Sequence, residues 1–189
     1  AILYGWILGQ ETGTAVADIL FGDTNPSGKM PVSVPRSVGN IPAYYNHKPT
    51  ARRGYAFADA SPLYAFGEGM SYTAFDISEP ILSSSIMGID EETSVSVEIT
   101  NTGMMAGEEV VQLYIRDKVS SVTRNVKDLK GFKRVSLAPG ETKTVTLPIR
   151  KESLWFYNLD MERVVEPGEF DIMVGNSSQN VKSVTLTVQ

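Results

Sequence analysis

Few side chains in this 189-residue sequence have the types and spacing that catalysis requires. His47 is the only histidine and there is no cysteine, so a zinc site would lack nitrogen and sulfur ligands. A Ser–His–Asp triad would also depend on His47, and no Gly-x-Ser-x-Gly turn is present to hold a nucleophilic serine. We therefore predict no catalytic nucleophile and no metal ligand, and we interpret His47 as a loop residue, with a substrate-facing role as the alternative.

Two carboxylates are sufficient to hydrolyse a glycosidic bond. Only Glu11 and Glu68 have the apolar, glycine-rich surroundings that such a pair would need. Glu11 lies at the start of a predicted helix, where the helix dipole favours an acid. Glu68 lies between Gly67 and Gly69, and close packing of the backbone explains these glycines. Neither glutamate is predicted to be catalytic.

The segment Gly22–Lys29 has some features of a phosphate-binding loop. Five residues separate its two glycines instead of four, and Met30 stands where Ser or Thr is required. The segment also follows a predicted helix, whereas a phosphate loop links a strand to a helix. We predict a structural turn.

Aromatic residues are dense at 154–157. Alternate residues of a strand face opposite sides, so one face would hold Leu154 and Phe156 and the other Trp155 and Tyr157, with one pair in the core and one pair facing outward. The outward pair is interpreted as covering a domain interface, with a platform for stacking sugars as the alternative. Asn176-Ser177-Ser178 is a glycosylation sequon, which has meaning only in a eukaryotic secretory pathway.

Composition and charge exclude several classes of partner. The net charge is −5, and the longest basic stretch, 127–134, is interrupted by Asp128, Leu129, Gly131 and Phe132. A nucleic-acid partner requires a continuous basic face, so none is expected. No run approaches the ~18 consecutive apolar residues of a membrane span, so no membrane partner is expected either. No residue pattern calls for a cofactor.

Residues 75–189 alternate apolar and polar side chains in short runs separated by turns rich in Gly, Pro and Asn. This period of two is typical of half-buried strands. Six or seven such strands in a segment of this length predict an antiparallel sandwich of two sheets. The runs predicted as strands are 95–100, 109–116, 131–137, 142–149, 169–174 and 183–188.

The first 36 residues are predicted to form a strand, a helix and a second strand. Residues 1–6 are an apolar run, typical of a strand buried on both faces. Residues 11–21 have the apolar spacing of an amphipathic helix, which should end at Gly22. Residues 30–34 alternate as an edge strand. So small a unit buries too little surface to fold alone, so we expect the rest of its sheet to lie upstream.

Residues 37–74 are rich in Gly, Pro, Tyr and Arg and show no sustained period. This pattern predicts a long irregular linker. Long ordered loops are usually functional or held by neighbouring domains, so this linker is the place to look for a site.

Motifs along the whole chain resemble, in order, the C-terminal part of glycoside hydrolase family 3, a family of β-glucosidases and β-xylosidases. Each motif is weak alone, but the combination in this order is specific. The end of that family's α/β sandwich domain is similar to 9–11, 15–23 and 25–31, and the stretch leading out of it resembles 44–49 and 66–72. The family's fibronectin type III-like domain is similar to 101–103, Gly107, 109–114, 129–132, 139–141 and 165–168.

This resemblance implies a mainly β fold. An antiparallel immunoglobulin/fibronectin type III-like β-sandwich at 75–189 would be preceded by the α/β remnant at 1–36 and the linker at 37–74. It also implies a retaining β-glycosidase, in which an Asp on an N-terminal barrel attacks the anomeric carbon and a Glu on the α/β domain protonates the leaving oxygen. No position of this sequence aligns with either motif, so no catalytic residue is assigned and the isolated chain is expected to be inactive.

Family members place loops of the α/β domain near the sugar pocket, which implies that the segment 44–53 touches substrate or its entrance. The candidate residues are Tyr45, His47, Lys48, Arg52 and Arg53. The implied partners are the N-terminal catalytic domains of the same enzyme and its glycoside or oligosaccharide substrate, with a homodimer as a further candidate. The implied location is periplasmic or secreted.

Two questions stay open at this point. A stand-alone carbohydrate-binding or interaction module, with Trp155 and Tyr157 as its platform, is the alternative to an accessory part of a glycosidase. Glucosides and xylosides are equally compatible with the sequence.

Overall fold

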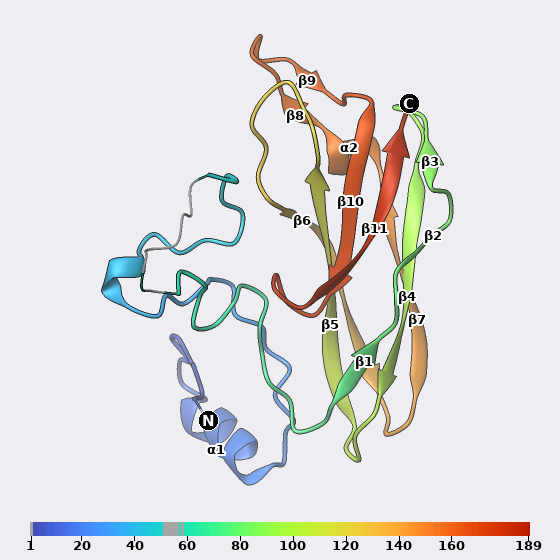
Figure 1. Cartoon of the computed structure of the whole chain (residues 1–189). Helices are drawn as coiled ribbons and strands as arrows, with labels where there is room; N and C mark the ends of the chain where they lie inside the picture. Colours follow the sequence, from blue (N-terminus) through green and yellow to red (C-terminus); the bar gives the residue numbers. More distant parts are fainter. Residues whose placement is uncertain (1, 51–56, 58) are drawn as a thin grey trace.

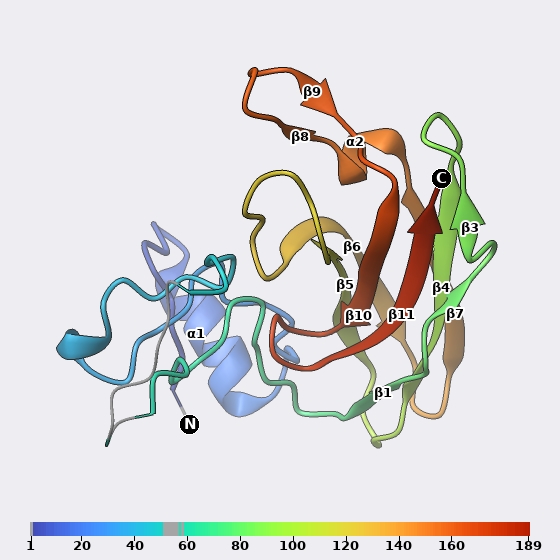
Figure 2. The same ribbon diagram turned by 45° about the horizontal axis from the view of Figure 1, so that its top comes forward.

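The computed structural model describes residues 2–50, 57 and 59–189 (Figure 1). Two β-sheets pack face to face in the C-terminal part, and the N-terminal part lies along one side of them (Figures 1 and 2). The mainly β, antiparallel sandwich predicted from the alternation of side chains is confirmed. No helix among the described residues has both the length and the apolar character needed to cross a bilayer.

The first sheet is built around β4 (Thr93–Asn101). β7 (Thr142–Ile149) pairs with β4 along its length, and the short strands β1 (Phe75–Ile77) and β2 (Ile81–Leu82) also pair with it. All of these pairings are antiparallel.

The second sheet has five strands in the order β3-β11-β10-β5-β6. Their bounds are β3 (Ile86–Met87), β11 (Val181–Val188), β10 (Gly168–Gly175), β5 (Gly107–Asp117) and β6 (Asp128–Leu137). Only β3 and β11 run parallel; the other neighbours are antiparallel. The six runs predicted as strands correspond to β4, β5, β6, β7, β10 and β11.

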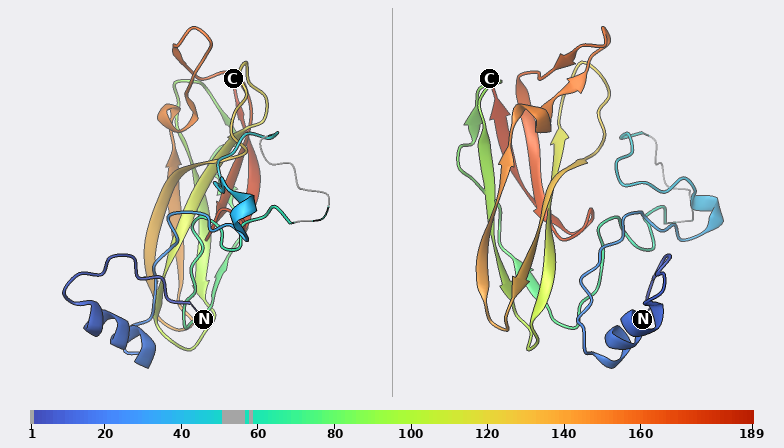
Figure 3. Two further views of the ribbon diagram at one scale, coloured as in Figure 1. Left: turned by 90° about the vertical axis from the view of Figure 1, so that its left-hand side faces the viewer. Right: turned by 180° about the vertical axis from the view of Figure 1, so that it is seen from behind.

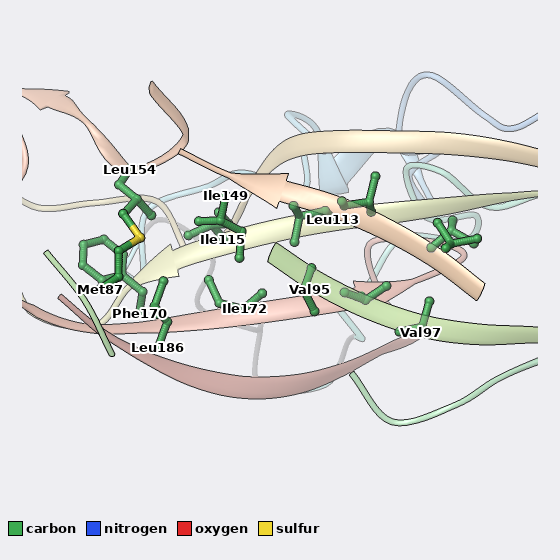
Figure 4. Packing of buried hydrophobic residues seen from close by; sticks show 14 of the residues in the cluster. Met87, Val95, Val97, Leu113, Ile115, Ile149, Leu154, Phe170, Ile172 and Leu186 are labelled. Atoms are coloured by element: carbon green, nitrogen blue, oxygen red, sulfur yellow. The ribbon is translucent and has the colours of Figure 1, made fainter. Parts of the chain in front are cut away.

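The core lies between the two sheets. Val95 of β4, Leu113 of β5 and Ile172 of β10 are fully buried, and Figure 4 shows their side chains meeting from different strands. Every second residue of β4, and of β7 from Val145 onward, is buried, which is the reason that alternation in the sequence located these strands. Burial of this apolar surface is the main stabilising contribution to the sandwich.

A short helix, α2 (Lys151–Leu154), and a hairpin of β8 (Phe156–Tyr157) and β9 (Arg163–Val164) stand at one end of the sandwich (Figure 1). Leu154 and Phe156 are buried, whereas Trp155 is half-buried and Tyr157 is exposed, so the structure identifies Leu154 and Phe156 as the core pair, a choice that the sequence left open. Residues 154–157 do not form one strand as predicted, because Leu154 ends α2 and only 156–157 are a strand.

The predicted helix is confirmed as α1 (Thr12–Phe21), which ends at Gly22 with a left-handed φ of 86°. A 3₁₀ turn, η1 (Val38–Asn40), follows further along the chain. α1 has no buried residue. Figure 3 shows it standing beside the sandwich without packing on either sheet.

The two strands predicted to flank α1 are wrong for the described residues. Residues 2–5 have no regular structure. At 30–34 the structure has one isolated antiparallel bridge, between Val34 and Tyr64, and separate backbone hydrogen bonds of Met30 with Gly67 and Glu68, but no continuous strand. A strand forms only when a neighbour accepts and donates its backbone hydrogen bonds. Pro31 and Pro35 also lack the N–H needed for a ladder.

Candidate functional site

The segment 44–49 lies against the five-stranded sheet and the loop that joins β5 to β6. Tyr45 makes the deepest contacts of this segment: its ring stacks on Phe66 with centroids 4.2 Å apart and meets Tyr114 edge-on at 5.7 Å. The backbone N–H of Leu129 donates to the Tyr45 hydroxyl oxygen at 3.2 Å. Burial raises the pKa of the Tyr45 phenol above its ordinary value. Tyr45 is therefore held as a half-buried anchor.

His47 and Lys48 continue this contact. The carbonyl oxygen of His47 accepts a hydrogen bond from the backbone N–H of Val126 at 2.9 Å. Lys48 Nζ donates to the carbonyl oxygen of Thr123 at 2.6 Å. The His47 ring is only half-buried, with Nδ1 2.9 Å from the Lys48 carbonyl oxygen and the ring of Tyr44 6.4 Å away. The segment thus binds the sandwich through its backbone and leaves part of the His47 ring accessible.

Three of the five predicted site residues, Tyr45, His47 and Lys48, are neighbours in sequence and lie in the segment that contacts the sandwich. Arg52 and Arg53 lie outside the described residues.

Gln112 and Tyr114 support this segment and were not predicted. They lie on the face of β5 opposite to the core residue Leu113, yet both are buried. The Tyr114 hydroxyl donates to Gln112 Oε1 at 2.6 Å, and burial raises the pKa of the Tyr114 phenol. Gln112 Nε2 donates to the carbonyl oxygens of Gly67 at 3.1 Å and Asn176 at 2.7 Å. A signal was available, because β5 is almost continuously buried and such a run is typical of a strand covered on both faces.

The two glycines around Glu68 have the packing role predicted for them. Gly67 has a φ of 79°, and a Cβ there would collide with the Gln112 amide. A Cβ on Gly69 would collide with the backbone of Gly28. The Glu68 carboxylate accepts the backbone N–H of Ala65 at 2.7 Å.

Lys29, the residue that would contact phosphate in a phosphate loop, is used in an ion pair. Its Nζ lies 2.6 Å from Glu109 Oε1, and the two side chains are 13% and 5% exposed. Nζ also donates to the Gly69 carbonyl oxygen at 3.2 Å. The prediction of a structural turn at 22–29 is consistent with this contact, which ties the turn to the first residues of β5.

The aromatic pair Trp155 and Tyr157 is partly covered. The Arg163 guanidinium lies 4.1 Å from the centroid of the Trp155 ring, and its Nε donates to the Tyr157 hydroxyl at 3.2 Å. The two rings meet edge-on at 5.4 Å. An arginine stacked on the indole occupies a face that a sugar ring would need.

A polar hollow of about 400 Å³ lies where the β10–β11 turn meets the 68–69 backbone; its lining consists of Glu68, Gly69, Asn176, Ser177, Gln179 and Asn180. Ligand sites in proteins are mostly lined by apolar and aromatic side chains with a few polar groups. This lining has the opposite character, so the hollow is not assigned as a site.

Two family models match the chain. Residues 1–72 match the glycosyl hydrolase family 3 C-terminal domain, and residues 109–178 match the fibronectin type III-like domain. The chain belongs to glycosyl hydrolase family 3. The second match also agrees with the sandwich topology described above, and together the two matches place the chain in the C-terminal part of family 3 proteins.

Individual family 3 proteins match along almost the whole chain. A periplasmic β-glucosidase from Salmonella typhimurium is 48% identical over 96% of this chain and 25% of its own length. A β-xylosidase from Formosa agariphila is 47% identical over 100% of this chain and 27% of its own length. The chain thus spans about a quarter of the length of the curated relatives that it matches.

Solved structures give the same picture. The β-glucosidase EmGH1 from Erythrobacter marinus superposes with a TM-score of 0.91 and 46% identity, covering 94% of this chain and 24% of that one. A β-glucosidase from Listeria innocua, solved in complex with glucose, gives 0.92 and 39%, covering 97% and 27%. The fold of this chain is therefore that of the corresponding region in these two β-glucosidases.

Proposed function

We propose that this chain is the C-terminal accessory portion of a retaining β-glycosidase that acts on β-glucosides or β-xylosides. In this proposal the nucleophile and the acid/base belong to N-terminal catalytic domains of the same enzyme, and the 189-residue chain alone is inactive. The names of the matched relatives, β-glucosidase and β-xylosidase, support the reaction class.

The observation that carries the proposal is a contrast between the two parts of the chain. The sandwich has its own closed apolar core. In the N-terminal part, by contrast, Trp6, Ile7 and Phe21 are 59%, 98% and 85% exposed. Large exposed apolar patches mark surfaces that contact other protein. Further α/β structure is the partner that would cover them, and we propose the division 1–36, 37–74 and 75–189 on this basis.

The sandwich would have a mechanical role in the enzyme. Tyr45, His47 and Lys48 are fixed to it through Leu129, Val126 and Thr123, which leaves the outer side of the segment free to border the substrate. Arg52 and Arg53 follow in sequence and belong to the same prediction. Binding segments positioned by a rigid β-scaffold are a common arrangement.

Replacement of His47 by Ala in the complete enzyme tests this role. If the ring borders the substrate, KM should rise about two- to tenfold with kcat nearly unchanged, the cost of one lost hydrogen bond. Arg150→Ala is a suitable control because Arg150 pairs with Glu92 in an exposed contact remote from the segment. Unchanged KM and kcat in the His47 variant would refute the role.

The stand-alone carbohydrate-binding module remains the competing function, and a titration separates the two. Addition of cellobiose or xylan fragments to the chain should give no saturable change in tryptophan fluorescence, since Arg163 covers the Trp155 ring. A saturable change that Trp155→Ala abolishes would favour the binding module.

We further propose that the enzyme is periplasmic or secreted, as the name of the Salmonella relative suggests for that protein, and that it forms a homodimer. Fractionation of the source cells should place the β-glycosidase activity outside the cytosol. Light scattering on the complete enzyme should give twice the mass of one chain, and a monomer mass would rule the dimer out.

A further inference from the structure

The loop Lys118–Lys127 joins β5 to β6 and contains no helix or strand; it is called the strap below. Figure 2 shows it beside the β8–β9 hairpin at one end of the sandwich. On its other side the strap holds the candidate segment, because Val126 N–H donates to the His47 carbonyl oxygen at 2.9 Å and the Thr123 carbonyl oxygen accepts from Lys48 Nζ at 2.6 Å. The position of the strap therefore sets the position of 47–48.

Arg124 ties the strap to the sandwich. Its guanidinium lies 4.3 Å from the centroid of the Phe156 ring, and Nη1 lies 4.0 Å from Asp117 Oδ2. The Arg124 and Asp117 side chains are 15% and 3% exposed. Neither Nη1 nor Oδ2 has a hydrogen-bond partner in the described part of the chain. The contact is thus an ion pair in a low-dielectric site without a direct hydrogen bond.

Such a pair is a poor way to gain stability. Desolvation of two charges can exceed their attraction, and buried ion pairs are often replaceable by apolar residues at no cost. The pair instead fixes the position of the strap relative to the end of β5. Removal of one partner leaves an uncompensated buried charge, so the arrangement in which the two charges face each other is strongly preferred.

The packing around the strap indicates why a fixed anchor is needed. A hollow of about 270 Å³ lies between the strap, the end of β5 and Pro49, and Asp117 and Arg124 are part of its wall. The strap is therefore not packed solidly against 47–49. Polar contacts join the strap to its neighbours: Val126 and Thr123 bind 47–48, Arg124 faces Asp117, and the backbone N–H of Ser121 donates to Glu166 Oε2 at 2.9 Å.

We infer that Arg124 is a positioning residue for the segment 45–49, acting through the strap and through its pairing with Asp117. The effect of Arg124 on substrate binding rests on the proposed function, in which the segment 45–49 borders the substrate. Arg124 itself lies behind the segment and contacts no substrate in this proposal.

The coupling is tested directly on the 189-residue chain by hydrogen exchange at the Val126 amide. Arg124→Gln should lower the protection of this amide about tenfold or more, because a buried charge contact is lost. Arg124→Lys keeps the charge and should restore part of the protection. Arg150→Gln is the matched control, since Arg150 forms an exposed ion pair with Glu92, and it should leave Val126 unchanged.

A double variant distinguishes a local effect on the strap from a general loss of the fold. Asp117→Asn with Arg124→Gln leaves no charge buried, so the β10 amides should stay protected while Val126 still loses protection. Unchanged protection of Val126 in this variant would overturn the coupling. Loss of protection at β10 together with Val126 would also overturn it, because the pair would then support the fold and not the position of the strap.

Kinetics of the complete enzyme on an aryl β-glucoside complete the test. Arg124→Gln should raise KM about tenfold with little change in kcat, and Arg124→Lys should recover part of the loss. If Val126 loses protection and KM does not change, the coupling stands and the proposed substrate role of 45–49 fails. An unchanged Val126 refutes the coupling whatever the kinetics show.

Discussion

At the scale of single residues, polar groups with little or no exposure connect the two parts of the chain. Lys29 and Glu109 form an ion pair of 2.6 Å with almost no solvent contact, and Gln112 bridges Gly67 and Asn176. The ring of Tyr114 packs edge-on against the ring of Tyr45, with centroids 5.7 Å apart. These side chains fix the N-terminal part on the outer face of β5.

The Lys29–Glu109 pair should be costly to break from one side. Glu109→Gln leaves the Lys29 charge buried without its partner, and we expect a loss of about 3–5 kcal/mol in the free energy of unfolding. Chemical denaturation measures it. Glu92→Gln, which breaks an exposed pair with Arg150, should change the same quantity by less than about 1 kcal/mol. Equal effects of the two variants would show that the Lys29 charge is not held in a dry site.

Asp117 should make the free energy of unfolding of the chain depend on pH. Burial raises the pKa of its carboxyl in the folded state, an effect that the charge of Arg124 only partly offsets. The folded state then binds more protons than the unfolded state between the two pKa values, so this residue lowers stability as pH rises through that interval. Below the pKa of the unfolded state the effect is absent.

Asp117→Asn removes this effect. The stability of the variant relative to wild type should therefore increase as pH rises above about 4, the ordinary value for Asp. Urea unfolding of both proteins from pH 3 to about 7 measures the difference, and other carboxyls cancel in the comparison. A difference that stays flat or falls with pH would contradict the burial of a charged Asp117.

At the scale of elements, α1 and the sandwich strands differ in what they pack against. Leu20 and Phe21 of α1 are 65% and 85% exposed, whereas β5 and β10 contribute fully buried residues to the core. A helix of ten residues without a buried side chain has little stability of its own.

Hydrogen exchange should show this contrast. In the 189-residue chain the amides of α1 should exchange with little protection, while those of β5 and β10 are retained far longer. In the complete enzyme the α1 amides should become protected, because the proposed N-terminal domains would cover its apolar face. Protection of α1 equal to that of β10 in the 189-residue chain would contradict this account.

The sequence predicted the strands of the sandwich well because their burial alternates with a period of two, as in β4 and β7. It predicted α1 from its apolar spacing and from Gly22. It failed for the strands on either side of α1, since periodicity reports which face is apolar and not whether a neighbour exists to complete the ladder. Contacts such as Tyr45 with Leu129 join residues far apart in sequence, so no local pattern contains them.

The candidate segment illustrates the same limit. Its place in the irregular linker and its resemblance to family 3 singled out Tyr45, His47 and Lys48. The strap and the Asp117–Arg124 pair were not predicted, because a charged residue at the end of a strand is usually interpreted as exposed to solvent. Only the structure shows that these two charges are enclosed beside Phe156.

At the scale of the whole molecule, a sandwich with its own buried core stands beside an N-terminal part whose large apolar side chains Trp6, Ile7 and Phe21 are exposed. The N-terminal part lies along one side of the sandwich, and the β8–β9 hairpin stands at one end (Figures 1 and 3). The family 3 relatives are about four times as long as the aligned region, given that it makes up 25% and 27% of two of them. We therefore interpret the chain as a brace for an active site formed elsewhere in the enzyme.

The most direct test of this account is an assay of the purified 189-residue chain with 4-nitrophenyl β-glucoside and β-xyloside. If the chain is an accessory portion, it should release no 4-nitrophenol above the buffer blank with either substrate. Release that increases in proportion to the concentration of the chain, and that follows it through purification, would contradict the accessory role.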